Sequence, residues 1–159
     1  MQLMFLLPFF QWCDDTFLGK WVRSGQWEFP IIETIHILAL TFLFAAIVVI
    51  DLRLMGLMMK GWTVSKLADE LRVYLNASVV VILISGTLLF LSEAVKAFDN
   101  PAFWVKIYLL IATLIFHYTI YSKTIHQEEV DRGKGVVIGS LSLLGWIGLG
   151  WAGRAIGFV

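Results

Sequence analysis

The residues of this chain that could do chemistry are a few ionisable side chains set inside long apolar stretches. Glu33, His36 and Asp51 belong to one stretch, and Lys106 and His117 belong to another. Histidine can ligate haem iron, and carboxyl and imidazole groups inside a membrane can relay protons. Because a charge among lipids costs several kcal/mol, such side chains normally face the interior of a helix bundle.

Their spacing predicts two polar helix faces. At about 100° per residue, positions eighteen apart on an α-helix point the same way, so Glu33 and Asp51 share a direction. His36 lies one turn from Glu33, on nearly the same face. Lys106 and His117 are eleven positions apart and fall within ~20° of each other. We therefore expect the two faces to meet inside the protein.

Depth along the predicted helices divides the polar residues into two clusters. Counting about 1.5 Å per residue, His36 and His117 differ in depth by ~15 Å. We expect Glu33 to pair with Arg154 or Lys106, because an unpaired buried charge is costly. The outer cluster comprises Glu33, His36, Glu93, Lys106 and Arg154. The inner cluster comprises Asp51, Arg53, Arg72, Asn76, His117 and Tyr121.

Four runs without Asp, Glu, Lys or Arg lie at 34–50, 73–92, 107–122 and 135–153, and the charged residues of the two clusters flank them. With its flanks each run reaches the roughly 20 residues that a membrane-crossing helix needs. The runs lack the alternation of barrel strands. They predict an all-α, up-down-up-down four-helix transmembrane bundle within residues 29–159. The expected helices are about 30–55, 70–93, 101–123 and 135–155, after an outer interfacial segment at 1–28.

Helix-start signals refine these boundaries. Asn100 followed by Pro101 predicts a cap and a proline in the first helical turn. Ser65, followed by Asp69 and Glu70, predicts a serine cap for the second helix.

Composition excludes several classes of protein. Hydrophobic residues make up 59% of the 159 positions, which is too apolar for an ordinary soluble domain. The formal net charge is zero, so no bias toward nucleic acid exists. The single cysteine, Cys13, cannot form an internal disulfide, and the chain has no catalytic motif and no cysteine-based metal motif.

The positions of the basic residues predict the orientation. Seven flank the first and third connections, and five lie on the opposite side. By the positive-inside rule we expect those two connections in the cytoplasm and both termini on the outer face of a bacterial inner membrane. The seven are Arg53, Lys60, Lys66, Arg72, Lys123, Arg132 and Lys134, and the five are Lys20, Arg23, Lys96, Lys106 and Arg154.

Small residues predict where helices pack, since close approach in lipid relies on them. Ser78, Ser85 and Ser92 form a stripe at seven-residue spacing. The last helix carries glycines at threes and fours, with Ser142 and Trp146 among them. This glycine-rich face could pack within the chain, against another membrane subunit or in a homodimer.

Four sequence blocks carry a resemblance to a known family. They are Ile-Glu-Thr-Ile-His at 32–36, Asp-Leu-Arg-Leu-Met-Gly at 51–56, Asn-Pro-Ala-Phe-Trp-Val-Lys at 100–106, and Gly153-Arg154. The chain from Trp27 onward resembles an uncharacterised family of small bacterial inner-membrane proteins with four predicted helices. The resemblance implies a fold and a compartment but no activity. A looser similarity to copper-resistance D-type and b-type cytochrome membrane proteins carries no residues over.

Three functions are compatible with these features. A non-catalytic accessory or scaffold component needs only helices that pack together and internal charges that are paired, and the sequence offers both. A haem b electron carrier would use His36, His117 or both, although their depths argue against one shared iron. Proton or ion translocation would run through Glu33, His36, Asp51 and His117.

Overall fold

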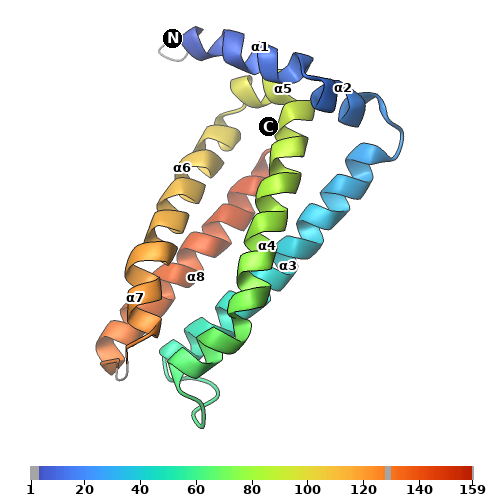
Figure 1. Cartoon of the computed structure of the whole chain (residues 1–159). Coiled ribbons are helices and arrows are strands. Elements are labelled where there is room, and N and C mark those ends of the chain that lie inside the picture. The colour runs from blue at the N-terminus through green and yellow to red at the C-terminus, as the bar shows by residue number, and fades with distance from the viewer. Residues whose placement is uncertain (1–3, 128–129, 159) are drawn as a thin grey trace.

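The computed structural model describes residues 4–127 and 130–158, and the elements in those ranges are helical. Four long, apolar helical stretches form an up-down-up-down bundle (Figure 1). They are α3 (Glu28–Leu54), α4 (Val64–Ser92), the stretch Pro101–Ile125 and α8 (Arg132–Ala155). Each is long and apolar enough to cross a bilayer. The predicted all-α four-helix transmembrane architecture is confirmed.

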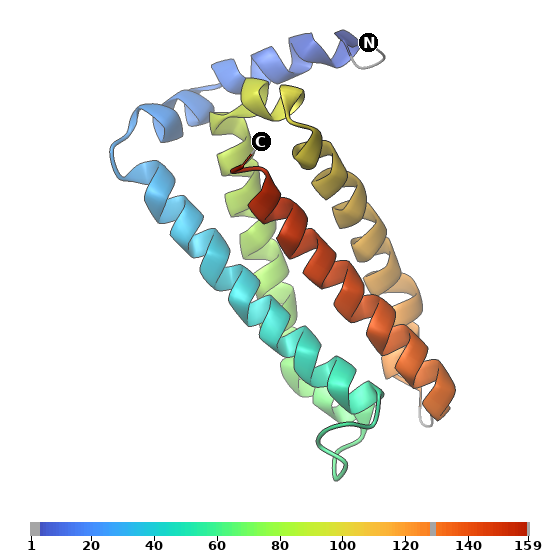
Figure 2. The ribbon, with the colours of Figure 1, turned by 180° about the vertical axis from the view of Figure 1, so that it is seen from behind.

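The four membrane helices pack against one another to different extents. α3 packs most extensively against α4, and α8 packs against both α3 and the helix that begins at Pro101. Figure 2 shows α8 running between those two partners. Both chain termini lie at one end of the bundle, here called the terminal end (Figure 1). The connection 55–63 and the described residues 126–127 and 130–131 lie at the other end, here called the loop end.

Caps explain where three helices begin. The Asn100 side chain accepts hydrogen bonds from the backbone of Ala102 and Phe103, so α6 (Pro101–Phe116) starts where the sequence predicts. α4 is capped by Thr63, which accepts from the Lys66 backbone N–H at 3.2 Å. The predicted Ser65 cap is therefore wrong, and α4 begins about two turns earlier than expected. Its first turns are amphipathic, with Leu67 and Ala68 buried, and they precede the apolar run. Asp131 caps α8.

The third membrane helix changes its winding near the loop end. After α6 the chain forms a π-helical segment, η2 (His117–Tyr121), and then returns to α-helix in α7 (Ser122–Ile125). Single π turns inside α-helices are rare and frequently occur at functional sites. The sequence predicted a continuous helix here, and no residue type in the segment signals the change.

Short helices cover the terminal end of the bundle. η1 (Met4–Leu6), α1 (Leu7–Asp15) and α2 (Phe17–Ser24) cross it, and α5 (Ala94–Asp99) links α4 to α6 (Figure 1). Phe10 anchors α1 in an aromatic cluster, 5.4 Å from Phe90 and 5.2 Å from Phe98 between ring centroids. Arg23 of α2 donates to the Ser92 carbonyl at 3.3 Å. These contacts fix the N-terminal segment to the bundle.

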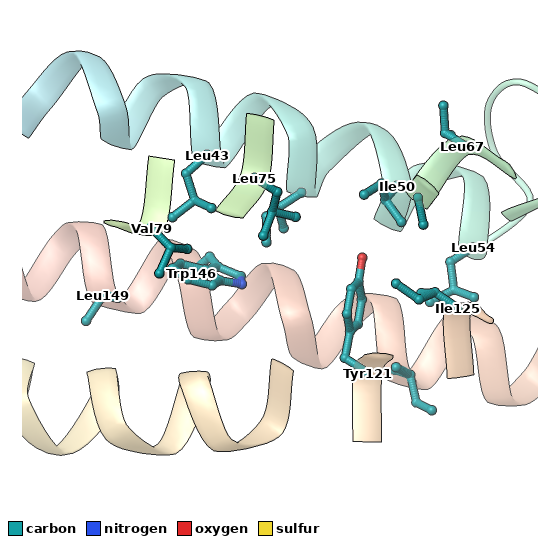
Figure 3. Packing of buried hydrophobic residues seen from close by; sticks show 13 residues of the cluster. Leu43, Ile50, Leu54, Leu67, Leu75, Val79, Tyr121, Ile125, Trp146 and Leu149 are labelled. Carbon is teal, nitrogen blue, oxygen red and sulfur yellow. The ribbon is translucent and has the colours of Figure 1, made fainter. Parts of the chain in front are cut away.

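The core lies along the bundle axis, where Leu43, Val79, Trp146 and Leu149 pack together (Figure 3). The predicted serine stripe is buried: Ser78, Ser85 and Ser92 are at most 8% exposed. It is confirmed as a packing face.

The glycine face of α8 has a partner within the chain near the loop end. A Cβ at Gly135 would lie 2.5 Å from the Leu54 carbonyl oxygen, and one at Gly139 would lie 3.2 Å from that of Asp51. Here the glycines allow α8 to approach α3 closely. Gly150, farther along α8, has nothing within 4 Å of such a Cβ.

Candidate functional site

Near the loop end, three helical segments bring four polar side chains into the bundle interior. Asp51 comes from the last turns of α3, His117 and Tyr121 from η2, and Ser142 from α8. Asp51 and Tyr121 are fully buried, Ser142 is 1% exposed and His117 is 6% exposed. We call these four residues the Asp51 cluster. Three of them belong to the inner cluster that the sequence predicts.

Local structure explains how the residues meet. Gly139 lets α8 approach the backbone of α3 at Asp51, and Ser142 follows one turn later on the same side of α8. The π turn places both His117 and Tyr121 in the interior. Figure 3 shows the Tyr121 hydroxyl pointing from η2 toward α3.

The aromatic contacts of His117 hold its ring in place. Its imidazole stacks on Tyr121 with centroids 5.0 Å apart and planes inclined by 23°. The Trp146 ring meets the imidazole edge-on at 5.9 Å and 83°. This side chain is therefore positioned by packing, without a hydrogen bond to its Nδ1.

The polar atoms of the Asp51 cluster lack partners in the protein. The hydroxyls of Tyr121 and Ser142 lie beside the Asp51 carboxyl, but none of these oxygens has a partner with hydrogen-bond geometry. Among the described residues, five buried side-chain nitrogen and oxygen atoms are unpaired, and all five belong to this cluster. An unpaired buried polar atom costs about 1–3 kcal/mol and calls for an explanation. Their concentration at one place marks a candidate site.

The other residues of the predicted inner cluster lie elsewhere. Arg53 is half-buried and donates its Nε–H to the Trp62 carbonyl at 2.5 Å. Arg72 and Asn76 are exposed, and Asn76 accepts from the Tyr118 hydroxyl at 3.5 Å. The structure therefore does not bring these three residues to Asp51.

A second polar group lies toward the terminal end. His36 is 9% exposed, and its Nδ1 lies 2.8 Å from the Ser85 hydroxyl of α4. Ser85 in turn donates to the Val81 carbonyl at 2.6 Å, so the histidine Nδ1–H is the donor in the first bond. Half-buried Lys106 acts electrostatically on His36 from α6. We call His36, Ser85 and Lys106 the Lys106 group.

The remaining residues of the predicted outer cluster are at the surface or paired elsewhere. Glu33 is exposed and, among the described residues, has no ion pair within 4.0 Å, so its predicted pairing with Arg154 or Lys106 is wrong. The Glu33 side chain faces away from the bundle interior, so it does not meet the cations of α6 and α8. Glu93 pairs with Lys96 at 2.7 Å. Arg154 is exposed, with its guanidinium 4.6 Å from the centre of the Phe158 ring.

An apolar layer separates the two polar groups. Between His36 and Asp51, the inward side chains of α3 are Ala39, Leu43, Ala46, Ile47 and Ile50. Val79 of α4 and Trp146 of α8 lie at the level of Leu43, and Leu149 lies beyond them (Figure 3). The two histidines consequently have different neighbours, and the geometry offers no site at which both could ligate one haem. Within residues 4–127 and 130–158, no group of three or more His, Cys, Asp or Glu side chains could hold a metal ion.

Sequence reasoning assigned Ser85 and Ser142 to packing stripes and missed their polar roles. Both lie on the same helix faces as larger buried residues, so spacing alone gives them a packing role. The useful signal would have been a hydroxyl at the depth of an ionisable residue on a neighbouring helix: Ser85 beside His36 and Ser142 beside Asp51.

The long apolar helices and their buried polar groups define a multi-pass helical membrane protein. The comparisons with known proteins extend this class to a family. Residues 9–159 match a family of unknown function, DUF6644, and because the match covers most of the sequence, the chain belongs to that family. No curated protein matches the chain, and no solved structure does either.

Proposed function

We propose that the protein is a non-catalytic membrane component whose Asp51 cluster takes up and releases one proton. The single observation that carries this proposal is the fully buried Asp51 carboxyl, beside two hydroxyls and without a hydrogen-bond partner. A bare carboxylate at such a position carries a large desolvation cost unless a proton or cation neutralises it.

The chemistry of the surroundings favours a proton over a metal cation. The groups that face Asp51 are the hydroxyls of Tyr121 from η2 and Ser142 from α8. His117, stacked on Tyr121, adds a further titratable group to the cluster. A divalent metal prefers several carboxylate, imidazole or thiolate ligands. A protonated carboxyl needs only an acceptor oxygen, and either hydroxyl can supply one.

The apolar layer supports exchange on one side of the membrane rather than translocation. A proton passing from Glu33 or His36 to Asp51 would have to cross a level filled by Leu43, Ile47 and Trp146. From Asp51 to the loop end the path is shorter: only the last turn of α3 remains, and the buried side chains there are Leu54, Leu67 and Ile125 (Figure 3). One-sided exchange fits an accessory subunit that responds to protonation better than it fits a channel.

The proposal includes an orientation and a compartment. With the loop end in the cytoplasm, the majority of the basic residues lie inside, as the positive-inside rule requires. Both termini, with α1 and α2, then lie at the outer interface of a bacterial inner membrane. The Asp51 cluster would exchange its proton with the cytoplasm.

Infrared difference spectroscopy of the reconstituted protein tests the proposal. Raising the pH should remove a carbonyl-stretch band of a buried protonated carboxyl, and Asp51→Asn should lack that band. Asp69→Asn is the matched control, because Asp69 is exposed and lies 3.4 Å from His126 at the loop end. Absence of any Asp51-dependent band over the stable pH range would refute proton binding.

A flux measurement separates binding from translocation. Liposomes containing the wild-type protein should hold an imposed proton gradient as well as empty liposomes do. A leak that Asp51→Asn abolishes would overturn one-sided exchange and favour a proton path.

A further inference from the structure

Lys106 directs a positive charge into the bundle near the terminal end. It lies five residues after the start of α6, or about 8 Å along the helix axis. Its Nζ would be 3.5 Å from a Cβ at Gly153 of α8, so the side chain lies against that helix. Its charge also acts on His36 of α3. The ammonium group therefore lies where three helices converge.

The charge of Lys106 has no acidic partner among the described residues. Glu33 is exposed and forms no ion pair there, while Glu93 is paired with Lys96. The described ion pairs do not include Lys106. A lysine near a helix end can extend along its own helix to reach water. Here the contact with Gly153 turns the side chain toward α8 instead. An unpaired cation in this position attracts an anion.

A second cation lies at the rim of the same region. Arg154 follows Gly153 directly, and its exposed guanidinium lies over Phe158. Asn100, at the start of α6, donates its side-chain N–H to the Ile156 carbonyl at 3.1 Å. This bond fixes the end of α8, which carries Arg154, against the start of α6, which carries Lys106.

The outer surface of α6 is suited to a lipid. Val105 and Tyr108, which flank Lys106 in sequence, are 52% and 62% exposed. They offer an apolar surface along which an acyl chain can pack, at about the same depth as Lys106. A free phosphate would use the cations but not this surface.

We propose that Lys106 and Arg154 bind a phosphate oxyanion at the terminal end of the bundle, with the Lys106 group on its inner side. The most suitable source is the headgroup of an anionic phospholipid in the outer leaflet, and inorganic phosphate is the alternative source. Lysine supplies a point charge to the phosphate and arginine a planar pair of donors. This site is separate from the Asp51 cluster and does not depend on proton binding there.

Native mass spectrometry of the detergent-solubilised protein provides the lipid test. The wild type should retain one phosphatidylglycerol in preference to phosphatidylcholine. Lys106→Gln should weaken that retention roughly tenfold or more, as loss of a charged hydrogen bond predicts. Lys106→Arg should keep it. Lys96→Gln is the control, because Lys96 is exposed and already paired with Glu93.

A second measurement distinguishes the source of the phosphate. Inorganic phosphate is added to delipidated protein, and the melting midpoint is followed. A Lys106-dependent rise without selective lipid retention would assign the site to the free anion. Lys106→Met is included so that a folding defect of one variant cannot decide the result. Equal lipid retention and equal phosphate response in wild type, Lys106→Gln and Lys106→Met would overturn the proposal.

Discussion

His117 lies flat against Tyr121, with ring centroids 5.0 Å apart and planes inclined by 23°. The contact joins two residues of a single π turn, so the irregular winding of η2 and the arrangement of the rings are parts of one feature. It carries the Tyr121 hydroxyl to the Asp51 carboxyl on α3 while the imidazole meets Trp146 of α8. The π turn thus couples three of the four membrane helices.

Tyr121→Phe should leave the protein as stable as the wild type or make it slightly more stable. The buried hydroxyl makes no hydrogen bond of good geometry, and Ser142 remains beside Asp51 as an acceptor for its proton, so removal of the hydroxyl relieves a desolvation cost and keeps the ring stack. Tyr121→Ala should instead cost about 3–5 kcal/mol, because it empties a fully buried ring position. Thermal unfolding in one detergent compares the variants. A large loss of stability in Tyr121→Phe would mean that the hydroxyl has a partner in the folded protein.

Gly135→Ala should destabilise the bundle, whereas Gly150→Ala should not. A Cβ at Gly135 would lie 2.5 Å from the Leu54 carbonyl oxygen and would force α8 away from α3. Overpacking of this kind costs about 1–3 kcal/mol, against a gain of up to about 1 kcal/mol in helix propensity. At Gly150 nothing lies within 4 Å, so only the gain remains. Melting midpoints of the two variants should therefore move in opposite directions, and a common direction would contradict the packing described.

Ser85→Ala should weaken the contact between α3 and α4. The substitution leaves the buried Nδ1 of His36 without its partner, at a cost of about 1–3 kcal/mol. Thr87→Val is the matched control, since the exposed Thr87 hydroxyl donates only to the Leu83 carbonyl of its own helix. Denaturation of the purified variants gives the comparison. If Thr87→Val and Ser85→Ala lowered the free energy of unfolding equally, the bond between His36 and Ser85 would not stabilise the contact between α3 and α4.

The sequence was sufficient for the membrane helices because hydropathy and caps act locally. Apolar length determined the four spans, and Asn100 with Pro101 marked the start of α6. Helical phase and depth also brought together Asp51, His117 and Tyr121.

The errors come from features that are not local. A uniform 100° rotation places Glu33 and His36 on one face, yet the structure buries His36 and exposes Glu33. Which residues of a polar helix face are buried depends on how that helix crosses its neighbours. The crossing is set by close contacts between helices, such as that of Gly139 with the Asp51 backbone. The π turn at His117–Tyr121 was likewise missed, because no residue type in the segment indicates it.

Cys13 should be alkylated slowly in the folded protein and only at more alkaline pH than in the unfolded chain. It is 2% exposed on α1, packed in the aromatic cluster with Phe10, and burial raises the pKa of its thiol. Since the thiolate is the nucleophile, a raised pKa leaves less of it at neutral pH. Iodoacetamide labelling followed by mass spectrometry over a pH series gives the rates, with detergent-denatured protein as the reference. Phe10→Ala should shift the pH profile of labelling in the folded protein toward that of the unfolded chain. Equal pH profiles in the folded and unfolded wild type would show that α1 does not pack on the bundle as described.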